Sequence, residues 1–573
     1  MQIRVNNADG KYSPSLSTGA LYGNLLPKRV IKVTTTAPAA YNLFYGYIES
    51  ITPHPHLSQQ DAFISAIDGL DFLARHELDT VLWKDKLTGY LVNEIADNAY
   101  GNILTNGNFE DGDPPDDWTL EGVGASVSRS TEQKIVGSYS AKLTRNGANC
   151  NLYQTISNYA SYIGKKLVIR AWVYATVASR ARLYIDDGIT GWFSLYHSGV
   201  AGWEQLSKTL TVNATATQLK ISCRIDTGDT SAYFDGVILV KGHKCLPGKI
   251  LDSGQDTVPL AYWHKVRARF ALEEVEDSEL GFIYFNGAGE LCFEDRHHRF
   301  SATHQTSQAT FDDTMVDIFY DYSARKVFNE IRATITPWEL KTIAELWRLE
   351  ETPSIENGET ITLWGNFEFF ADAITTPVAT TDYTANSAAD GGGDDETANV
   401  TITMSKLAKA VKLVIQNDAA HIVYITFFRV RGTYYDSETK LSRKSEDATS
   451  QGLYQKRTLS IDGKYLTDAD LAQNYCDYAL GRFKDPQADI VITLINKSST
   501  LLTQILSREI SDRITVKNTE LGLDRKYFIN KMEHEITQGG TVHRCRWYLV
   551  DAENEDFWLL DYSLLGTGTK ISY

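Results

Sequence analysis

Two short stretches of the sequence carry imidazole and carboxylate side chains of the kind that bind metal ions. Residues 294–299 read EDRHHR, and residues 52–56 read TPHPH. We expect the first stretch to lie in a strand, where the adjacent His297 and His298 point to opposite sides and cannot share one ion. His54 and His56 would share one face of an extended chain, but no third ligand accompanies them. We therefore predict no metal at either stretch.

Carboxylates are plentiful elsewhere, but their spacing singles out no catalytic set. Glu533 and Glu535 flank His534, and strand alternation places the glutamates on one side and the histidine on the other, as in a solvated strand face. Residues 386–399, NSAADGGGDDETAN, do not follow the spacing of a calcium loop, and we expect a mobile loop there. The sequence contains no G-x-S-x-G, H-E-x-x-H or P-loop motif, and no glycosidase carboxylate pair stands out. We predict that the protein is not an enzyme.

Composition excludes several classes of partner. The chain has 573 residues and a formal net charge of −17, so it lacks the clustered Lys and Arg that phosphate backbones require. No apolar stretch approaches the length of a membrane span, and the N-terminus lacks the layout of a signal peptide. We therefore expect synthesis in a cytoplasm and no membrane-spanning segment. The 31 Tyr and 11 Trp against 4 Met favour β-structure with aromatic contact surfaces.

Periodicity predicts which elements position these side chains. Short alternating strands separated by turn residues fill most of the chain, most densely over 104–241. A hairpin is predicted over 281–295, turning at Asn286, Gly287 and Gly289. Helices are expected at four places: 79–98 (closed by Gly101), within 260–278, at 341–351, and at 467–483 (capped by Thr467 or Asp468).

These patterns predict a mainly β fold, more fully a β-rich α+β fold, in which a discontinuous scaffold is entered twice. We expect insertions at polar, turn-rich junctions whose ends lie close together. The predicted parts are 1–103 with 244–355 (scaffold, first part), 104–243 (inserted jelly roll), 356–434 (second inserted β-sandwich) and 435–573 (scaffold, C-terminal part).

The scaffold segments resemble the tail hub proteins of tailed bacteriophages, also called tail-tip or baseplate hub proteins. The resemblance covers about 430 residues, all except the first insertion, and rests on several motifs in the expected order. They include NADGKYSP, LYGNLLPKRVIKV, NLFYGYIESITP, ILDSGQDTVPLAYW, GELCFEDRHHRF, ITFFRVRGTYY, ALGRFKDPQADIVI and RKYFINKMEHEI.

This resemblance implies a structural assembly protein at the virion tail tip, assembled in the host cytoplasm. Such hubs form a homotrimer with two tail-tube-like β-barrel domains per chain, which gives a pseudo-sixfold ring. The implied partners are the distal tail protein, the tape-measure protein and other tail-tip proteins, with DNA only passing through the lumen. Ring formation would also pair strand edges that a monomer leaves exposed.

The first insertion resembles the jelly-roll carbohydrate-binding modules of families 4, 9 and 22. The matching stretches are NGNFEDGDPPDDW, GSYSAKLT, RAWVYA, GWEQLSKTLTV and YFDGVILVK. In those modules an acidic motif near the first strand and a late Asp hold a structural calcium, and the matching residues here are Glu110 and Asp235. A hard cation suits carboxylate oxygens, so the resemblance implies a structural Ca²⁺; the alternative is that both are turn residues.

Sugar binding in such folds uses aromatic faces against sugar rings and polar groups against hydroxyls. In RAWVYA, Trp172 and Tyr174 share one face, opposite Ala171 and Val173, and that face is either core or binding surface. The candidate carbohydrate-binding residues are Trp172, Tyr174, Tyr184, Trp192, Tyr196 and Arg224, and the implied ligand is a host cell-surface polysaccharide.

The sequence thus predicts a phage tail hub whose inserted module contacts host glycan. Two alternatives stay open: a carbohydrate-active enzyme with an appended binding module, and the hub of a phage-derived injection or gene-transfer particle.

Overall fold

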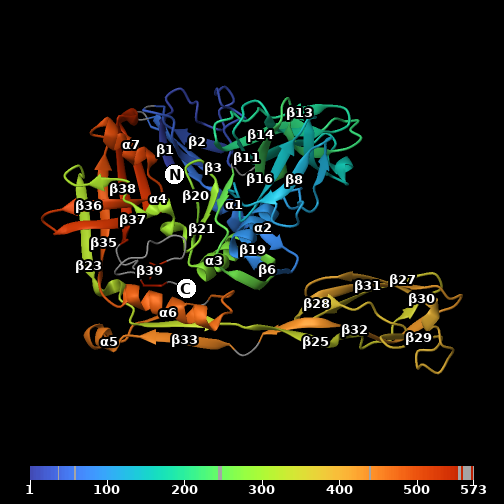
Figure 1. The fold of residues 1–573 in the computed structure, drawn as a ribbon. Coiled ribbons are helices and arrows are strands. Elements are labelled where there is room, and N and C mark those ends of the chain that lie inside the picture. Colours follow the sequence, from blue (N-terminus) through green and yellow to red (C-terminus); the bar gives the residue numbers. More distant parts are fainter. Residues whose placement is uncertain are drawn as a thin grey trace.

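Strands dominate every region of the protein, which confirms the predicted mainly β fold. The computed structural model describes residues 1–36, 38–56, 60–242, 248–437, 440–461, 463–552, 557–558 and 570–571. Figure 1 shows a body composed of several sheets and a long arm that projects from its lower side. Within the described part of the chain, no helix has the length and apolarity needed to cross a membrane.

The N-terminal region forms a four-stranded antiparallel sheet in the order β1-β4-β3-β2. Its strands are β1 (Gln2–Asn6), β2 (Val30–Thr34), β3 (Asn42–Pro55) and β4 (Gln60–Ile67). Apolar side chains such as Ile3, Val5 and Ile31 alternate along one side but are only half-buried. None of the described residues of this sheet belongs to a buried hydrophobic cluster of the chain. Ile64 and Ala62, the register partners of Ile3 and Val5 on β4, are buried, so this apolar side is covered at its centre and half-buried toward its edges.

The scaffold core lies beneath this sheet and packs three helices against short strands around the fully buried Trp263. The predicted helix at 79–98 begins only at Thr88, because residues 83–87 pair with a later strand. Gly101, at φ 69°, ends that helix as predicted. The elements are α1 (Gly69–Arg75), β5 (Glu77–Asp79), β6 (Trp83–Leu87), α2 (Thr88–Tyr100), β17 (Lys249–Leu251), β18 (Thr257–Ala261), β19 (His264–Arg267), α3 (Ala268–Glu279), β20 (Phe282–Phe285) and β21 (Leu291–Glu294).

The two predictions on either side of residue 280 are confirmed. Helix α3 lies within the predicted 260–278 window apart from its last residue, and β20 and β21 form the predicted antiparallel hairpin. Gly289 adopts φ 80° at the turn, where a Cβ would meet the ring of Tyr45.

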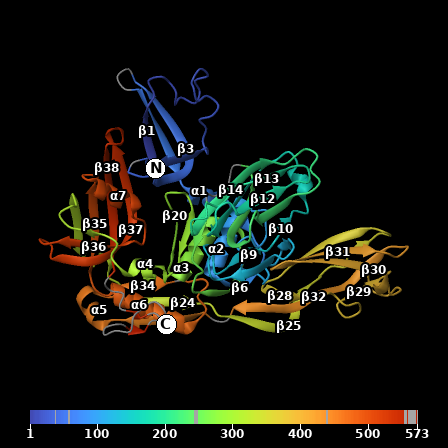
Figure 2. The same cartoon turned by 45° about the horizontal axis from the view of Figure 1, so that its top comes forward.

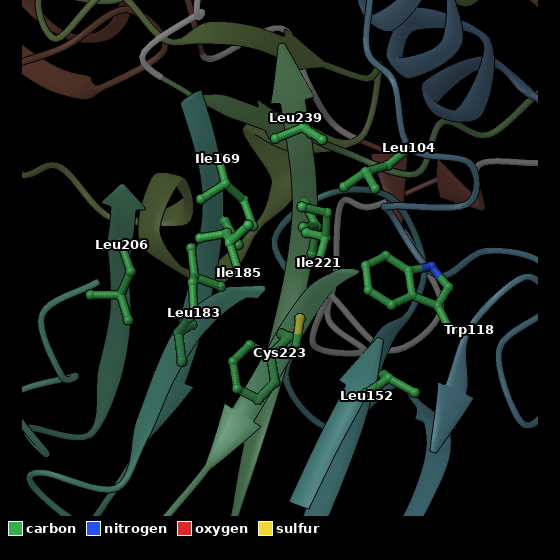
Figure 3. Packing of buried hydrophobic residues seen from close by; sticks show 14 of the residues in the cluster. Leu104, Trp118, Leu152, Ile169, Leu183, Ile185, Leu206, Ile221, Cys223 and Leu239 are labelled. Carbon is green, nitrogen blue, oxygen red and sulfur yellow. The ribbon is translucent and has the colours of Figure 1, made fainter. Parts of the chain in front are cut away.

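Residues 119–241 form two five-stranded antiparallel sheets packed face to face. Their orders are β13-β12-β15-β10-β7 and β14-β11-β16-β9-β8. Figure 3 shows the core between them, with Leu183, Ile221 and Cys223 from the first sheet meeting Ile169 and Leu239 from the second. The elements are β7 (Thr119–Glu121), β8 (Ser126–Ser130), β9 (Ser140–Arg145), β10 (Cys150–Thr155), η1 (Tyr159–Tyr162), β11 (Lys166–Ala175), β12 (Ala181–Asp186), β13 (Gly191–Phe193), β14 (Gly202–Thr211), β15 (Lys220–Ile225) and β16 (Thr230–Lys241).

The arm is built on a two-stranded ribbon of β25 (Trp338–Arg348) and the long β32 (Val423–Ser437). The predicted helix at 341–351 is therefore wrong, because most of this stretch is strand β25. A small β-sandwich with its own core forms the outer part of the arm. Its elements are β26 (Ser354–Ile355), β27 (Thr360–Asn366), β28 (Phe370–Ile374), β29 (Tyr383–Asn386), η4 (Thr397–Asn399), β30 (Val400–Lys406) and β31 (Ala410–Asn417).

The acidic loop at 386–399 is folded around one side chain. The Asn386 amide donates to the carbonyl oxygens of Gly391 and Gly393 and accepts from the amides of Ala388 and Gly393. These bonds tie the loop to the end of β29, whereas the composition had predicted a mobile loop.

The C-terminal part contains a six-stranded sheet in the order β22-β36-β37-β38-β35-β23 and a three-stranded sheet, β33-β24-β34, covered by α6. Helix α6 follows Asp468, whose carboxylate accepts the amides of Asp470 and Leu471, as predicted. The elements are η2 (His298–Phe300), α4 (Ala302–Gln305), β22 (Thr310–Phe311), β23 (Asp317–Ser323), η3 (Ala324–Lys326), β24 (Glu330–Ile335), β33 (Leu441–Glu446), α5 (Ala448–Tyr454), β34 (Thr458–Ile461), α6 (Ala469–Phe483), β35 (Gln487–Ile495), α7 (Ser499–Ser507), β36 (Arg513–Asn518), β37 (Leu523–Thr537), η5 (Gln538–Gly540), β38 (Val542–Asp551), β39 (Phe557–Trp558) and β40 (Lys570–Ile571).

Figure 2, turned so that the top comes forward, shows the N-terminal sheet and the sheet of β35–β38 standing on the same side of the molecule. The arm extends on the other side, beyond the jelly roll. The protein thus contains two sheets whose edge strands are exposed and two separate β-sandwiches.

Candidate functional site

The six residues predicted to contact sugar lie at three different places. Trp172 and Tyr174 project from β11 on the side of their sheet that faces away from the core, since Ala171 and Val173 fill the core. Tyr184 and Arg224 project from the other sheet. The structure therefore does not bring the six candidate residues together in one place.

Trp172 joins the jelly roll to the scaffold. Its indole N–H donates to the carbonyl oxygen of Lys249 at 3.0 Å, and its ring packs against the scaffold core. On the same outer face, Val168, Ile238 and Val240 form a small buried cluster. The edge strand β14 keeps this face partly accessible through the exposed Ser207 and Thr209, and at its far end Tyr174 contacts the rings of Trp203 and Tyr233. Trp172 is a structural residue of the junction.

Trp192 faces the jelly-roll core. In the register of β12 with β13 it lies opposite Ile185, which is fully buried, and it packs against the same core cluster. Its neighbour Phe193 points the other way, lies opposite Tyr184, and stacks on that ring with centroids 4.7 Å apart. Phe193 is 36% exposed. The sequence motif GWF contains two adjacent aromatic residues, and only the pairing register shows which of the two rings faces outward.

The open side of the first sheet forms a continuous polar and aromatic surface, which we name the β15 face after its central strand. Each of its residues alternates with a core residue along its strand. The β15 face consists of Thr119, Glu121, Asn151, Tyr153, Arg182, Tyr184, Asp186, Phe193, Lys220, Ser222 and Arg224.

One row of this face crosses all five strands. Thr119 pairs with Tyr153, which pairs with Ser222, which pairs with Tyr184, which pairs with Phe193. Neighbouring strands lie about 4.8 Å apart, so the row spans about 19 Å. The Ser222 side chain lies at its centre, and its hydroxyl is buried without a hydrogen-bond partner among the described residues.

Two arginines of the β15 face are held by one buried carboxylate. Asp226, with its side chain 2% exposed, lies 3.2 Å from Nε of Arg224 and 2.5 Å from Nη2 of Arg182. The Tyr196 hydroxyl donates to the same carboxylate at 3.2 Å, and burial together with Asp226 raises the pKa of Tyr196. Arg224 also donates to the Asn151 side-chain oxygen. The guanidinium groups are thereby fixed in position at the surface.

The arginines also lie against the aromatic rings. The Arg182 guanidinium is 3.7 Å from the ring centre of Phe193 and 4.3 Å from that of Tyr196. Lys220 lies 3.8 Å from the ring centre of Tyr153. Of the six predicted residues, Tyr184, Tyr196 and Arg224 come together here, and Tyr153, Arg182, Phe193 and Ser222 are the partners that the sequence reading missed. Flat rings alternating with fixed hydrogen-bonding groups are suited to a ligand with apolar faces and many hydroxyls.

Glu110 and Asp235, the residues implied to hold calcium, instead hold a loop. One oxygen of Glu110 accepts the amides of Ser138 and Tyr139 at 2.7 and 2.8 Å. Asp235 accepts the amides of Ile135 and Val136 on one oxygen and that of Gly236 on the other. The loop in turn exchanges backbone hydrogen bonds with Leu251 of the scaffold strand β17.

This donor set does not fit calcium. Ca²⁺ takes six to eight oxygens, and here five N–H groups point at three of the four carboxylate oxygens. Within the ranges that the structure describes, no group of three or more His, Cys, Asp or Glu side chains is placed to hold a metal ion. The calcium site stays a prediction, and the geometry argues against it.

Glu110 makes a testable contribution to the pH dependence of stability. Burial raises the pKa of Glu110 to about 7, so its stabilising contribution is complete near pH 4.5 and is lost as the pH rises through 7. Glu110→Gln keeps the accepting oxygen without the charge. We expect the variant to melt a few degrees above the parent at pH 8 and level with it at pH 5. Ca²⁺ should leave both melting temperatures unchanged; a Ca²⁺-dependent rise that Glu110→Gln abolishes would restore the calcium site.

The metal candidates of the scaffold have other roles. His297 and His298 follow β21 in a turn and a 3₁₀-helix, so the expectation that they lie in a strand is wrong. His298 Nδ1 lies 2.7 Å from Asp252, and the carboxylates around it raise the pKa of His298 although burial opposes this. His54 lies 3.3 Å from Asp61.

Comparison with known proteins finds no matching protein-family model and no matching curated protein. Among solved structures, the chain is similar to the C-terminal family 22 carbohydrate-binding module of Clostridium thermocellum Xyn10B, with 15% identity, a TM-score of 0.22, and coverage of 26% of this chain and 98% of that one. A family 4 module gives 20% identity, a TM-score of 0.20, and coverage of 24% and 99%. The enzymatically active domain of bacteriophage CBA120 tailspike protein 4 gives 18% identity, a TM-score of 0.21, and coverage of 25% and 21%. These likenesses are too low to assign a family to the chain.

Proposed function

We propose that the β15 face binds a polysaccharide of a host cell surface. The observation that carries this proposal is the row from Thr119 to Phe193, in which three aromatic rings and a buried hydroxyl cross the whole sheet. A row of about 19 Å is long enough for several consecutive sugar rings. The rings supply stacking surfaces, and Arg182, Arg224 and Lys220 supply fixed donors for hydroxyl or carboxylate groups.

The other sheet is a poorer candidate because the scaffold covers the part of its outer face that surrounds Trp172. Trp172 and the loop at 135–139 both bond to β17, and Val168, Ile238 and Val240 are buried. The β15 face is on the opposite side of the sandwich, so a long polymer would reach it without meeting that junction.

Tyr153→Ala and Phe193→Ala are expected each to weaken binding of the full-length protein to its glycan about tenfold, because each removes one stacking ring. A glycan array of bacterial surface polysaccharides identifies the ligand, and titration of the best binder gives the affinities. Tyr174→Ala, which removes an aromatic ring from the other sheet, is the matched control and should bind like the parent. Unchanged binding by both face variants, or loss only in the control, would contradict the proposal.

A second role is favoured by the exposed edge strand β23 (Asp317–Ser323). We propose that the chain is a structural tail hub of a phage, whose copies close into a homotrimeric ring between the tail tube and the tip. Strand β23 lies at the edge of the six-stranded sheet and pairs only with β35 among the described strands. It exposes Phe319 at 55% and Tyr322 at 62%. This edge, together with the half-buried apolar side chains of the N-terminal sheet, supports an assembly in which edge strands of neighbouring copies pair with one another.

In this role the distal tail, tape-measure and other tip proteins are the expected partners, and DNA passes through the lumen. Negative-stain images of the purified protein should show rings. A monomer that releases reducing sugar from polysaccharide would instead favour the carbohydrate-active enzyme. A phage-derived injection or gene-transfer particle would use the same ring and is distinguished by the genes on either side.

A further inference from the structure

The outer end of the arm presents a second flat surface. Strands β27, β31 and β30 form a three-stranded antiparallel sheet there, at the end of the arm away from the scaffold (Figures 1 and 2). One side of this sheet packs onto the arm core through Leu363, Leu413 and Ile415 with their neighbours. The other side faces solvent.

We name the solvent side the arm platform. Its residues alternate with the core residues along each strand and align in rows across the three strands. The arm platform consists of Thr360, Thr362, Trp364 and Asn366 on β27, Ala410, Lys412, Val414 and Gln416 on β31, and Thr401, Thr403 and Ser405 on β30. Hydroxyl and amide groups are the commonest side chains, and Lys412 carries its one formal charge.

Trp364 is the unusual residue of the arm platform. It is 56% exposed, whereas every other tryptophan whose burial the structure describes is buried or half-buried. Its register neighbours are Lys412 and then Ser405, and Lys412 Nζ lies 5.9 Å from the centre of the indole. The strand is supported from below, because Trp347 packs against Gly365 so closely that a Cβ there would lie 2.6 Å from its ring. The indole is thus held on a rigid base.

The chemistry of the arm platform selects among possible occupants. A protein partner or a second copy would be expected to cover a larger apolar area than one indole with Val414 and Ala410. Nucleic acid would require several cations, and only Lys412 is present. An exposed ring beside many hydroxyl groups suits a sugar, whose ring stacks by its apolar face and whose substituents accept hydrogen bonds. In a chain of net charge −17, a lone lysine without an ion pair among the described residues also complements an acidic substituent.

We propose that the arm platform is a second carbohydrate-binding site, with one sugar ring stacked on Trp364 and a hydroxyl or carboxylate substituent bound by Lys412. This site is independent of the β15 face and stands if that proposal fails. Two sites on one chain would bind a long polymer with greater avidity than either site alone, and a ring of three copies would carry six.

The test uses full-length protein in which Tyr153→Ala and Phe193→Ala have already been introduced, so that only the arm platform is measured. The probes are xylan as a neutral polymer, polygalacturonate as an acidic one, and the glycan array. Trp364→Ala should weaken the remaining binding about tenfold, and Trp364→Phe should keep most of it because a ring is retained. Lys412→Gln should weaken binding of polygalacturonate more than that of xylan. Ile343→Ala is the matched control, because Ile343 is an exposed apolar residue (58%) of the ribbon strand β25 and is not part of the arm platform.

Loss of binding in Trp364→Ala with none in Ile343→Ala supports the proposal. Three results would overturn it: no glycan retained by the starting protein, equal retention by Trp364→Ala, or a change in particle mass caused by Trp364→Ala. The last result would mean that the indole covers a second copy of the chain. The first of these results, loss of all binding caused by the β15-face substitutions before any change at Trp364, would place the glycan site on the jelly roll alone.

Discussion

The double variant Phe319→Asp, Tyr322→Asp is expected to fold normally and to remain a monomer under conditions in which the parent forms rings. Both side chains are more than half exposed on the edge strand β23, so their removal leaves no cavity. Two carboxylates at the centre of a sheet-to-sheet contact would be buried without partners, and we expect assembly to weaken by about 100-fold or more. Mass photometry across a concentration series measures the effect.

Leu453→Asp is the control for this experiment. Leu453 is 70% exposed on α5 and lies on no strand edge, so the same added charge should leave the assembly intact. A double variant that assembles like the parent would show that β23 does not belong to the interface between copies. A parent protein that stays monomeric at every concentration would contradict the proposal that the chain is a tail hub.

Trp172→Ala is expected to loosen the jelly roll from the scaffold and to reduce the free energy of unfolding by about 2–4 kcal/mol. The indole packs against the scaffold core and donates to the Lys249 carbonyl, so the substitution opens a cavity and leaves a buried acceptor unpaired. Trp172→Phe keeps most of the packing and loses only the hydrogen bond, which costs about 1 kcal/mol. Thermal unfolding with calorimetric detection separates the two variants.

Glycan affinity provides a second readout for Trp172→Ala. Because Trp172 lies on the sheet opposite the β15 face, the folded variant should bind polysaccharide as tightly as the parent. A variant that is stable but no longer binds would place the sugar site on the Trp172 side, as the sequence had suggested.

Secondary structure was predicted correctly from the sequence where the local signals of an element agree with its tertiary contacts. Helix α6 has a capping aspartate at 468 and one apolar face, and the hairpin of β20 and β21 has a glycine where the turn requires a positive φ. Strand β25 shows the opposite case. Its residues, rich in Glu, Lys, Leu and Ala, have helical propensity, but pairing with β32 along the arm overrides that preference.

The candidate site was predictable in kind but not in position. Alternation correctly grouped Trp172 with Tyr174, yet it does not show that the scaffold covers their face, because that contact joins residues 77 positions apart. For Trp192 and Phe193, both aromatic and adjacent, the outward residue is decided by the register with β12. Glu110 and Asp235 were singled out by resemblance, and their partners proved to be amides of a docking loop.

Hydroxyl-radical footprinting of the full-length protein with and without its bound polysaccharide tests the glycan-binding claim most directly, because it reports which aromatic rings the ligand covers. We expect protection from oxidation at Tyr153, Tyr184 and Phe193 and unchanged oxidation at Tyr174 and Trp203. Protection of Tyr174 and Trp203, with Phe193 oxidised as in the free protein, would contradict the assignment of the β15 face.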